Sequence, residues 1–448
     1  MAKDIGSDLL SGKSLKDSAL TRIKELGEGV RDDVIQKVQS GSASISNQTS
    51  PIEFLIPGSG ESLIDLSSIS INAQLSVTKR NGMATLDTDL VTPVNNLLHS
   101  MFSRCTTLFN DKLVSTHINY PYKAIIDALL FSSEEAQKTY LTSSFFYKDT
   151  AGFLNETDPI KDVDEADPIK DAKNEGLIAR FKKSRQSQVL DLYGRLHFDF
   201  INQPKLLING VDVRIKLERS KDAFALMANS DNYQIRLKNI MLKVNRIEVS
   251  PSILLGMEKT LENSVIKMPY RRVNIKVFTL SKGILSSNIS NAIIGQIPKR
   301  IIIGLVRNNA FNGQIDLNPF NFENFDLNYI SVIKDSILIP PNPYTPDFDE
   351  KSYARSYATL FEEMGGIPYG KYANISYSDY AQGYMFHVFD LTPDKAASEN
   401  HTSIITHGNI SIDLKFKRPL PETINVVCYL EYRNTIEIDR SRNIFIDY

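Results

Sequence analysis

The stretch Ile69-Ser-Ile-Asn-Ala-Gln-Leu-Ser-Val77 places an apolar side chain at every second position. Successive side chains of a β-strand point to opposite faces, so this alternation predicts a strand with one buried and one solvated face. The same alternation runs through residues 211–217 and 410–416. Runs of this kind, rich in β-branched and aromatic residues and separated by Gly, Pro and Asn, are typical of antiparallel sheets. We therefore predict an all-β chain.

Helical patterning is sparse. One stripe with the spacing of a helix face consists of Tyr353, Tyr357, Leu360, Phe361 and Met364. A second stripe consists of Tyr122, Ile125, Ile126, Leu129 and Leu130. The apolar positions in both recur at intervals of three and four residues, the period of an α-helix. A few helices are expected among the strands.

The two halves of the chain carry the same elements in the same order. Thr107-Leu-Phe-Asn-Asp-Lys-Leu-Val114 and Ser331-Val-Ile-Lys-Asp-Ser-Ile-Leu338 each indicate strand–turn–strand, followed by Pro and one of the two helical stripes. Later in each half, Leu196-His-Phe-Asp-Phe and Phe386-His-Val-Phe-Asp precede a Pro, a Gly and an alternating strand. The ordered set predicts a duplicated β-sandwich. Because alternation lapses over residues 220–232, the units are expected at 51–225 and 226–448.

Residues 1–50 differ from the rest and are interpreted as an N-terminal arm. A helix-like apolar face runs from Leu15 to Val38, interrupted by Gly27 and Gly29, each of which costs about 1 kcal/mol inside a helix. The Ser-rich residues 40–50 are typical of a flexible linker. The arm is therefore expected to be partly helical and to order against a partner.

Composition excludes several classes of protein. The 448 residues include 51 Lys+Arg and 53 Asp+Glu, a net charge of −2, which argues against a basic nucleoprotein and against sequence-specific nucleic-acid binding. The apolar runs are far shorter than the roughly 20 residues that span a bilayer, so no transmembrane segment is predicted. The first residues lack an apolar core, so no secretory signal is expected. Two cysteines, Cys105 and Cys428, cannot form a disulfide framework and indicate a reducing compartment.

Signatures of catalysis fail when tested. Residues 6–14 resemble a phosphate-binding loop, but five residues separate the glycines where four are needed, and Gly58-Ser-Gly60 lacks the third glycine of a dinucleotide loop. No histidine has zinc-site spacing, and His197 and His387, inside apolar runs, are expected to be hydrogen-bonded core or interface residues. The acidic residues 162–165, within a doubled Asp-Pro-Ile-Lys-Asp motif, lack the order of a calcium loop and indicate a solvated loop. We predict no catalytic, cofactor-binding or metal-ligating residue, hence no enzyme.

Long loops carry aromatic residues, in 311–325, 339–344 and 369–384. Large rigid apolar groups must pack on something, either their own sandwich or a neighbouring subunit, and composition leaves both possibilities open. The basic clusters 182–185 and 271–272 are interpreted as solvated surface or interface ion pairs. Carbohydrate recognition is conceivable for a β-sandwich, but the chain has no Trp for stacking on sugars.

Several collinear motifs carry a resemblance to a known family. They are Ser50-Pro-Ile-Glu-Phe-Leu-Ile-Pro-Gly-Ser-Gly-Glu61, Tyr270-Arg-Arg272, Gln296-Ile-Pro-Lys-Arg300, Asn309-Ala-Phe-Asn-Gly313, Asn318-Pro-Phe-Asn-Phe322, Phe389-Asp-Leu-Thr-Pro393 and Leu420-Pro-Glu-Thr-Ile-Asn-Val426. Together they resemble the hexon-like, double jelly-roll major capsid proteins of Maverick/Polinton elements and adintoviruses, in the adenovirus-hexon lineage. The resemblance runs from about residue 50 to the end.

The resemblance implies two tandem eight-stranded antiparallel jelly rolls. It also implies a structural protein whose homotrimers form pseudo-hexameric capsomers that tile the icosahedral shell of a double-stranded DNA virus or virus-like mobile element. Expected partners are further copies, neighbouring capsomers, a single jelly-roll penton protein and minor capsid proteins. The expected location is the virion, after synthesis in the host cytoplasm or nucleus. The arm is expected to face the capsid interior or a neighbouring capsomer, and the repeat loop to lie at a jelly-roll end. The alternatives are a jelly-roll carbohydrate- or receptor-binding protein and a domesticated host copy without a virion.

Overall fold

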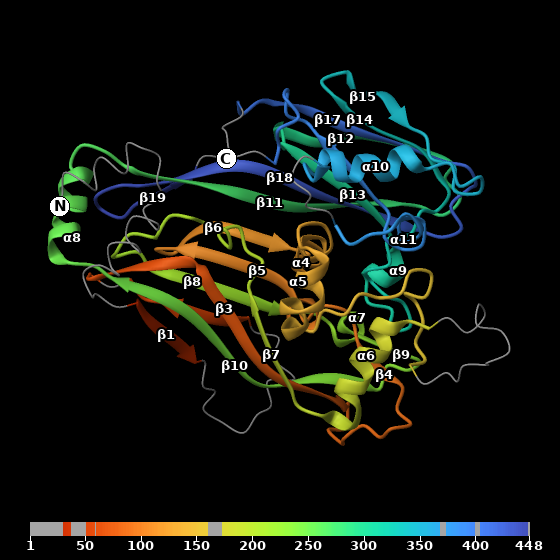
Figure 1. Ribbon diagram of the computed structural model, residues 1–448, viewed down its shortest axis with the longest axis horizontal. Helices are drawn as coiled ribbons and strands as arrows, with labels where there is room; N and C mark the ends of the chain where they lie inside the picture. Colours follow the sequence, from red (N-terminus) through yellow and green to blue (C-terminus); the bar gives the residue numbers. More distant parts are fainter. Residues whose placement is uncertain are drawn as a thin grey trace.

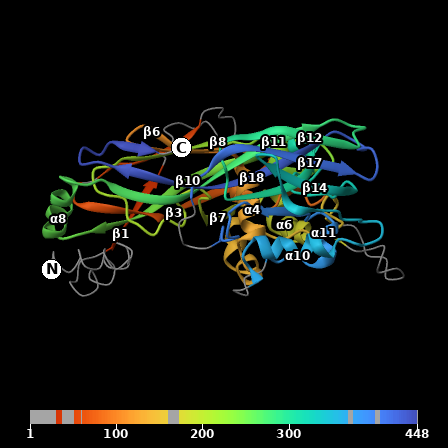
Figure 2. The same ribbon diagram turned by 90° about the horizontal axis from the view of Figure 1, so that it is seen from above.

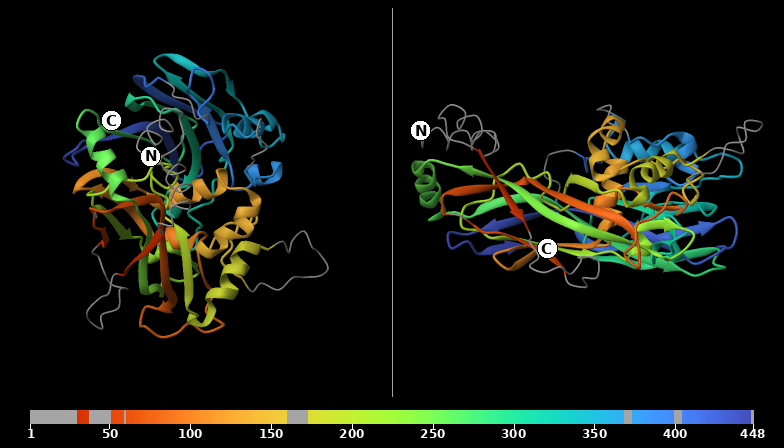
Figure 3. Two further views of the ribbon diagram at one scale, coloured as in Figure 1. Left: turned by 60° about the vertical axis from the view of Figure 1, so that its left-hand side comes forward. Right: turned by 90° about the horizontal axis from the view of Figure 1, so that it is seen from below.

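The computed structural model describes residues 30–36, 51–58, 60–159, 173–367, 373–398 and 404–446. In this part of the chain two β-sandwiches lie side by side, the first coloured orange to green and the second green to blue (Figure 1). Figure 3 shows the same pair from one end and from below. The helices α4, α6, α10 and α11 gather on one side of the sheets (Figure 2).

The first sandwich consists of one sheet with the order β1-β10-β3-β7 and another with the order β2-β8-β5-β6. Its strands are β1 (Val30–Gln36), β2 (Ile52–Ile56), β3 (Ser62–Lys79), β5 (Phe102–Phe109), β6 (Lys112–Ile118), β7 (Leu190–Arg195), β8 (Val213–Arg219) and β10 (Tyr233–Glu248). A short pair, β4 (Val91–Pro93) and β9 (Leu226–Ala228), lies beside it. The alternating residues 69–77 are in β3, and their apolar side chains are buried as predicted.

The second sandwich consists of one sheet with the order β11-β18-β13-β16, with β19 on β18, and another with the order β12-β17-β14-β15. Its strands are β11 (Ile266–Leu280), β12 (Ser286–Gln296), β13 (Arg300–Arg307), β14 (Leu327–Lys334), β15 (Ile337–Tyr344), β16 (Phe386–Asp390), β17 (His407–Phe416), β18 (Ile424–Ile438) and β19 (Ile444–Ile446). All pairings in both sheets are antiparallel.

The two sandwiches have one topology. When the eight main strands of each are numbered in chain order, the sheets in both follow 1-8-3-6 and 2-7-4-5. This order is the double Greek key of a jelly roll. The β5–β6 hairpin turns on Asn110 and Asp111, and the β14–β15 hairpin turns on Asp335 and Ser336, all four with positive φ, as a two-residue type I′ turn requires. The all-β fold with two tandem jelly rolls is confirmed.

The helices lie where the sequence predicted them. α4 (Tyr120–Leu130) and α10 (Ala354–Glu363) carry the two apolar stripes, and each follows the equivalent hairpin of its own roll. The remaining helical elements of the described part are α3 (Leu97–Ser100), α5 (Glu134–Lys138), η2 (Tyr140–Ser144), α6 (Glu175–Ser184), η3 (Arg185–Ser187), α7 (Asp222–Ala225), α8 (Pro251–Leu261), α9 (Asn308–Phe311) and α11 (Tyr377–Ala381). No helix of the described residues is long and apolar enough to cross a membrane.

Strand pairing crosses the position 225/226 at which the sequence predicted the second unit to begin. β10 pairs with β3 from Tyr233 to Glu248, and β9 pairs with β4. The lapse in alternation over residues 220–232 reflects α7 and a turn inside the first roll, since both interrupt the two-residue period without ending the sheet. We propose that the first roll extends to Glu248 and that α8 links the two.

The helix expected within the N-terminal arm is wrong at Val30–Gln36. This segment is β1, and it pairs with β10 from Val30 to Gln36 against Ile247 to Met241. Without it the last strand of the first roll would leave a row of backbone N–H and C=O groups unpaired, and backbone pairing outweighs a helix period already broken by two glycines. The other residues of the arm, the phosphate-loop-like residues 6–14 and the repeat from Ile160 onward lie outside the described residues.

Candidate functional site

The helix α4 joins the two rolls. Its first residue, Tyr120, belongs to the core of the first roll, whereas Tyr122, Ile125 and Leu129 belong to the core of the second. Pro121 in its first turn is compatible with a helix start, because the first N–H groups of a helix have no intrahelical partner. Conversely, the start of β11 and the end of β18 pack on the core of the first roll, through Met268 and Ile436 among others. Each roll therefore completes its core with an element of the other.

Asp127 is the polar centre of this junction. Its carboxylate accepts hydrogen bonds from Lys123 Nζ at 2.9 Å and Tyr429 Oη at 2.7 Å, and His197 Nδ1 lies 3.1 Å away. These partners come from α4, from β18 and from the loop after β7, so one carboxylate connects both rolls. Burial by itself would raise the pKa of Asp127, but Lys123, His197 and Arg271 together hold it well below its usual value. The group is an anion at every physiological pH.

The histidines of the junction are hydrogen-bonded, as expected for His197. His99 Nδ1 lies 2.9 Å from Tyr120 Oη, and the same hydroxyl accepts a hydrogen bond from the backbone N–H of His197. Burial, and then the nearby His197, lowers the pKa of His99 well below 6.5. Nearby, Asp199 accepts from Ser115 Oγ at 2.9 Å and from the N–H of Val273, which again connects first roll to second.

His387 departs from its expectation in one respect. It is buried in β16, but among the described residues neither ring nitrogen has a hydrogen-bond partner. Tyr344 and Tyr380 lie against it, with ring centroids 6.0 and 6.2 Å away. Burial lowers its pKa to about 3, so the imidazole is neutral in the fold.

A second carboxylate, that of Glu431 in β18, forms ion pairs with three cationic side chains. Its oxygens lie 2.9 Å from Arg271 Nε, 2.8 Å from Lys299 Nζ and 3.3 Å from the Arg300 guanidinium. Burial by itself would raise the pKa of Glu431, but Arg271, Arg300 and Lys299 outweigh it, and the pKa falls to about 2. The cluster lines a cleft of about 1200 Å³ between β11, the end of α4 and the end of α10.

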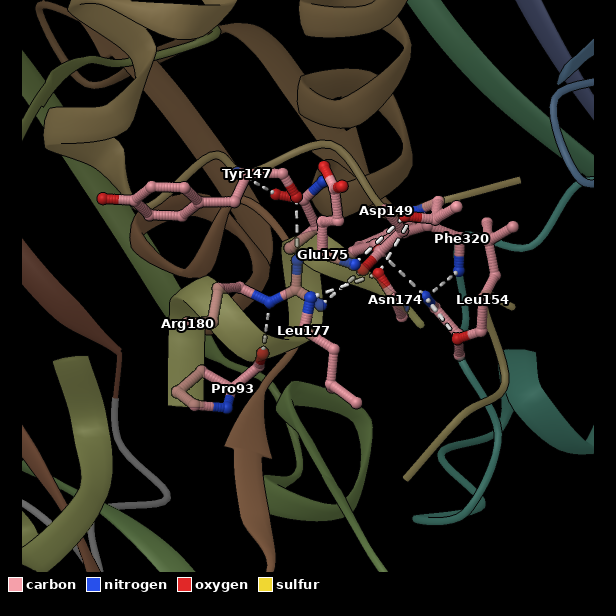
Figure 4. Close-up of polar contacts among 12 residues, drawn as sticks. Pro93, Tyr147, Asp149, Leu154, Asn174, Glu175, Leu177, Arg180 and Phe320 are labelled. Carbon is pink, nitrogen blue, oxygen red and sulfur yellow. Dashed lines mark hydrogen bonds and ion pairs between the residues drawn. The ribbon is translucent and has the colours of Figure 1, made fainter. Parts of the chain in front are cut away.

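A third polar cluster ties α6 to the second roll (Figure 4). Buried Arg180 donates to Pro93 O at 2.8 Å, to Tyr147 O at 2.8 Å and to Asp149 Oδ1 at 2.7 Å. The other oxygen of Asp149 accepts from Asn318 Nδ2 at 3.1 Å. Asn318 begins the Asn-Pro-Phe-Asn-Phe motif, so this motif is part of the contact between the rolls.

The aromatic loops of the described residues pack on their own chain. Tyr122 of α4 stacks on Phe311 at a centroid distance of 5.2 Å and meets Phe320 edge-on at 5.7 Å. Tyr353 and Tyr377 stack at 4.4 Å in the link before β16. Of the two possibilities that composition left open, the structure shows the first for these residues.

The other candidates of the sequence are structural. Cys105 and Cys428 are buried, and burial raises the pKa of each thiol to about 12, which makes both unreactive. Arg271 stacks on Phe131 at 4.2 Å, and Arg272 donates to Asn434 Oδ1 at 2.9 Å, so this basic pair serves contacts within the chain. Within the described ranges, no group of three or more His, Cys, Asp or Glu side chains is arranged to hold a metal ion.

Sequence reasoning missed the charged residues of the junction. Asp127, Arg300 and Glu431 each lie in an apolar run, and this position in the sequence could have identified them as buried charges. A charged side chain is almost never fully buried without a partner, so a charge inside an apolar strand predicts a buried ion pair. Which residues pair depends on the packing of two rolls, and a strand pattern does not contain this information.

The comparisons with known proteins agree with this architecture. No protein-family model matches the chain. The uncharacterized protein F54H12.2 of Caenorhabditis elegans is 23% identical over 420 residues, which cover 89% of this chain and 93% of that protein. A chain in the cryo-EM structure of the Sputnik virophage is similar with a TM-score of 0.61 and 12% identity, covering 94% of this chain and 88% of that one.

Two further solved structures are similar. The Faustovirus major capsid protein has a TM-score of 0.57 and 10% identity, covering 91% of this chain and 90% of that one. A chain of the PBCV-1 virus capsid has a TM-score of 0.54 and 11% identity, covering 94% and 97%. At these identities the similarity establishes the shared double jelly-roll fold along almost the whole chain.

Proposed function

We propose that this chain is a major capsid protein that assembles as a homotrimer. The observation that carries the proposal is the pair of jelly rolls of identical topology, side by side in one chain and fixed to each other by shared cores and buried ion pairs. A chain with this shape presents two similar lobes, and three copies around an axis present six. Such a capsomer has a pseudo-hexagonal outline and tiles a closed shell.

The comparisons support a capsid role through fold. A viral major capsid protein and chains of two virus particles share the architecture over at least 91% of this chain. The charge balance is compatible with many subunits in close contact, since a net charge of −2 on 448 residues produces little mutual repulsion. The role proposed here is structural and needs no catalytic group.

We place the chain in the Maverick/Polinton and adintovirus branch, on the motifs between residues 50 and 448. The nematode relative supports this placement, because a related sequence in an animal is expected if virus-like mobile elements carry such proteins. Neighbouring capsomers, a penton protein and minor capsid proteins are the expected partners, and the virion shell is the expected location.

The decisive experiment is the solution mass of the purified chain by light scattering over a dilution series. We expect about 151 kDa, three times the 50.4 kDa of one chain, stable on dilution, because obligate interfaces typically bury upwards of about 2,000 Å². The mass must be the same with and without a thiol reductant, since both cysteines are buried. A stable 50.4 kDa monomer, or a trimer that dissociates when the reductant is added, would contradict the proposal.

A further inference from the structure

The Glu431 cluster carries more positive than negative charge. Arg271, Lys299 and Arg300 all contact the one carboxylate. Glu431 and Arg300 are only 2% exposed, whereas the side chains of Arg271 and Lys299 are 32% and 23% exposed. Counting only the groups that contact Glu431 directly, three cations share one carboxylate.

Other carboxylates of the cleft are engaged elsewhere. Asp199 is held by Ser115, by the N–H of Val273 and by His117, whose Nε2 lies 3.3 Å from its oxygen. Glu134 is exposed and pairs with Lys138 on its own helix. Neither forms an ion pair or hydrogen bond with Arg271, Lys299 or Arg300 among the described residues, although the charges of Asp127 and Asp199 also act on Arg271.

The cluster also retains unused donors. Arg300 donates to Glu431 and to Ser398 Oγ, but its buried Nε has no hydrogen-bond partner in the described part of the chain. Lys299 makes bonds to Glu431 and to Ala397 O, which leaves one of its three N–H groups. Arg271 is held against Phe131, so its guanidinium is already oriented. Arg271 and Lys299, which are partly exposed, present their donors to the cleft, and Arg300 lies buried behind them.

We propose that this cleft binds a small oxyanion of the phosphate class, held by Arg271, Lys299 and Arg300 beside Glu431. Planar guanidinium groups and an ammonium group match the geometry of phosphate oxygens, and charge-assisted hydrogen bonds to such groups are about twice as strong as neutral ones. The cleft volume of about 1200 Å³ admits the ion with its water. A bound oxyanion neutralises the excess charge at the junction of the two rolls and stabilises their relative position.

The test is isothermal titration of the purified full chain with inorganic phosphate, against chloride at equal ionic strength. We expect saturable phosphate binding with one site per chain. Lys299→Met should weaken the affinity about tenfold or more, because a charge-assisted contact is lost. Lys417→Met is the matched control, since Lys417 is likewise a lysine in ion pairs, with Asp347 and Asp349, but it directly follows β17 and lies outside the cleft. It should bind phosphate like the unaltered chain.

A second variant is expected to change the phosphate affinity in the opposite direction. Glu431→Gln removes the competing anion, so a folded Glu431→Gln chain should bind phosphate more tightly than the unaltered chain, which a purely structural role would not produce. Equal affinity in Lys299→Met and Lys417→Met, or heat of binding no larger than that of chloride, overturns the proposal.

Discussion

Replacing His387 by Leu should stabilise the protein in acid far more than at neutral pH. The imidazole is buried in β16 with both nitrogens unpartnered among the described residues, and burial lowers its pKa from 6.5 to about 3. The folded chain keeps this group neutral, whereas the unfolded chain binds a proton below pH 6.5. Stability due to this residue is therefore complete above pH 6.5 and is lost as the pH falls toward 3.

The magnitude follows from the distance between the two pKa values. Between pH 6.5 and 3, each pH unit lowers the free energy of unfolding by about 1.4 kcal/mol. At pH 4.5 the free energy of unfolding of the unaltered chain is therefore about 3 kcal/mol lower than at pH 7.5 through His387 alone. Leu cannot take up the proton. Whatever Leu costs or gains by packing against Tyr344 and Tyr380 is the same at both pH values. The change in the Leu-minus-His difference between the two pH values isolates the titration.

The assay is urea unfolding at pH 7.5 and 4.5, followed by tyrosine fluorescence because the chain has 19 Tyr and no Trp. His407→Gln serves as control, since His407 is exposed at the start of β17 and should show no comparable change. Acid effects on carboxylates cancel, because they occur in both proteins. If His387→Leu changes the free energy of unfolding equally at pH 7.5 and 4.5, the imidazole has a partner that stabilises its charged form, and the reasoning fails.

Three further outcomes are expected. Asn318→Ala removes bonds to Asp149 and to a backbone N–H, and should destabilise by about 2–4 kcal/mol in urea unfolding; a loss below 1 kcal/mol would mean that water replaces the amide. Gly304→Ala places a Cβ 2.6 Å from a carbon of Phe322, so roughly 2 kcal/mol should be lost, measured by calorimetry; unchanged melting would show that the ring moves freely. The pKa of Glu431 is about 2 in the folded chain and 4.5 in the unfolded chain. This difference stabilises the fold by roughly 3 kcal/mol above pH 4.5, and the stabilisation is lost as the pH falls toward 2. Glu431→Gln should remove that part of the acid sensitivity, which an unaltered acid-unfolding slope would contradict.

The local pattern of the sequence was sufficient for the elements and for the duplication. Alternation at 69–77 and the paired hairpins at 107–114 and 331–338 depend only on which face of a strand is buried, and all three appear as predicted. Val30–Gln36 shows the limit. Its strand exists because β10 offers an unpaired edge, a tertiary fact that its own residues do not encode.

Strand pairing crosses the predicted unit boundary for a related reason. Loss of a two-residue period indicates that a strand ends, not that a domain ends, and α7 with its turn interrupts the first roll from within. In a jelly roll the last strand lies between the first and third of the same sheet, so its partners are the residues farthest away in the sequence. The pairing of β10 with β3, from Tyr233 onward, is the observation that supports our proposal that the first roll continues beyond residue 225.

The polar junction explains why two rolls in one chain act as one building block. Apolar surfaces alone would let the rolls slide, because the hydrophobic effect is not directional. Asp127 receives hydrogen bonds from Lys123 of one roll and Tyr429 of the other, and each has a preferred length and angle. Losing Lys123 or Tyr429 leaves the largely buried Asp127 carboxylate with fewer donors, so all its hydrogen bonds are satisfied in one relative position. A subunit that must repeat one geometry many times in a closed shell needs this uniqueness more than additional stability.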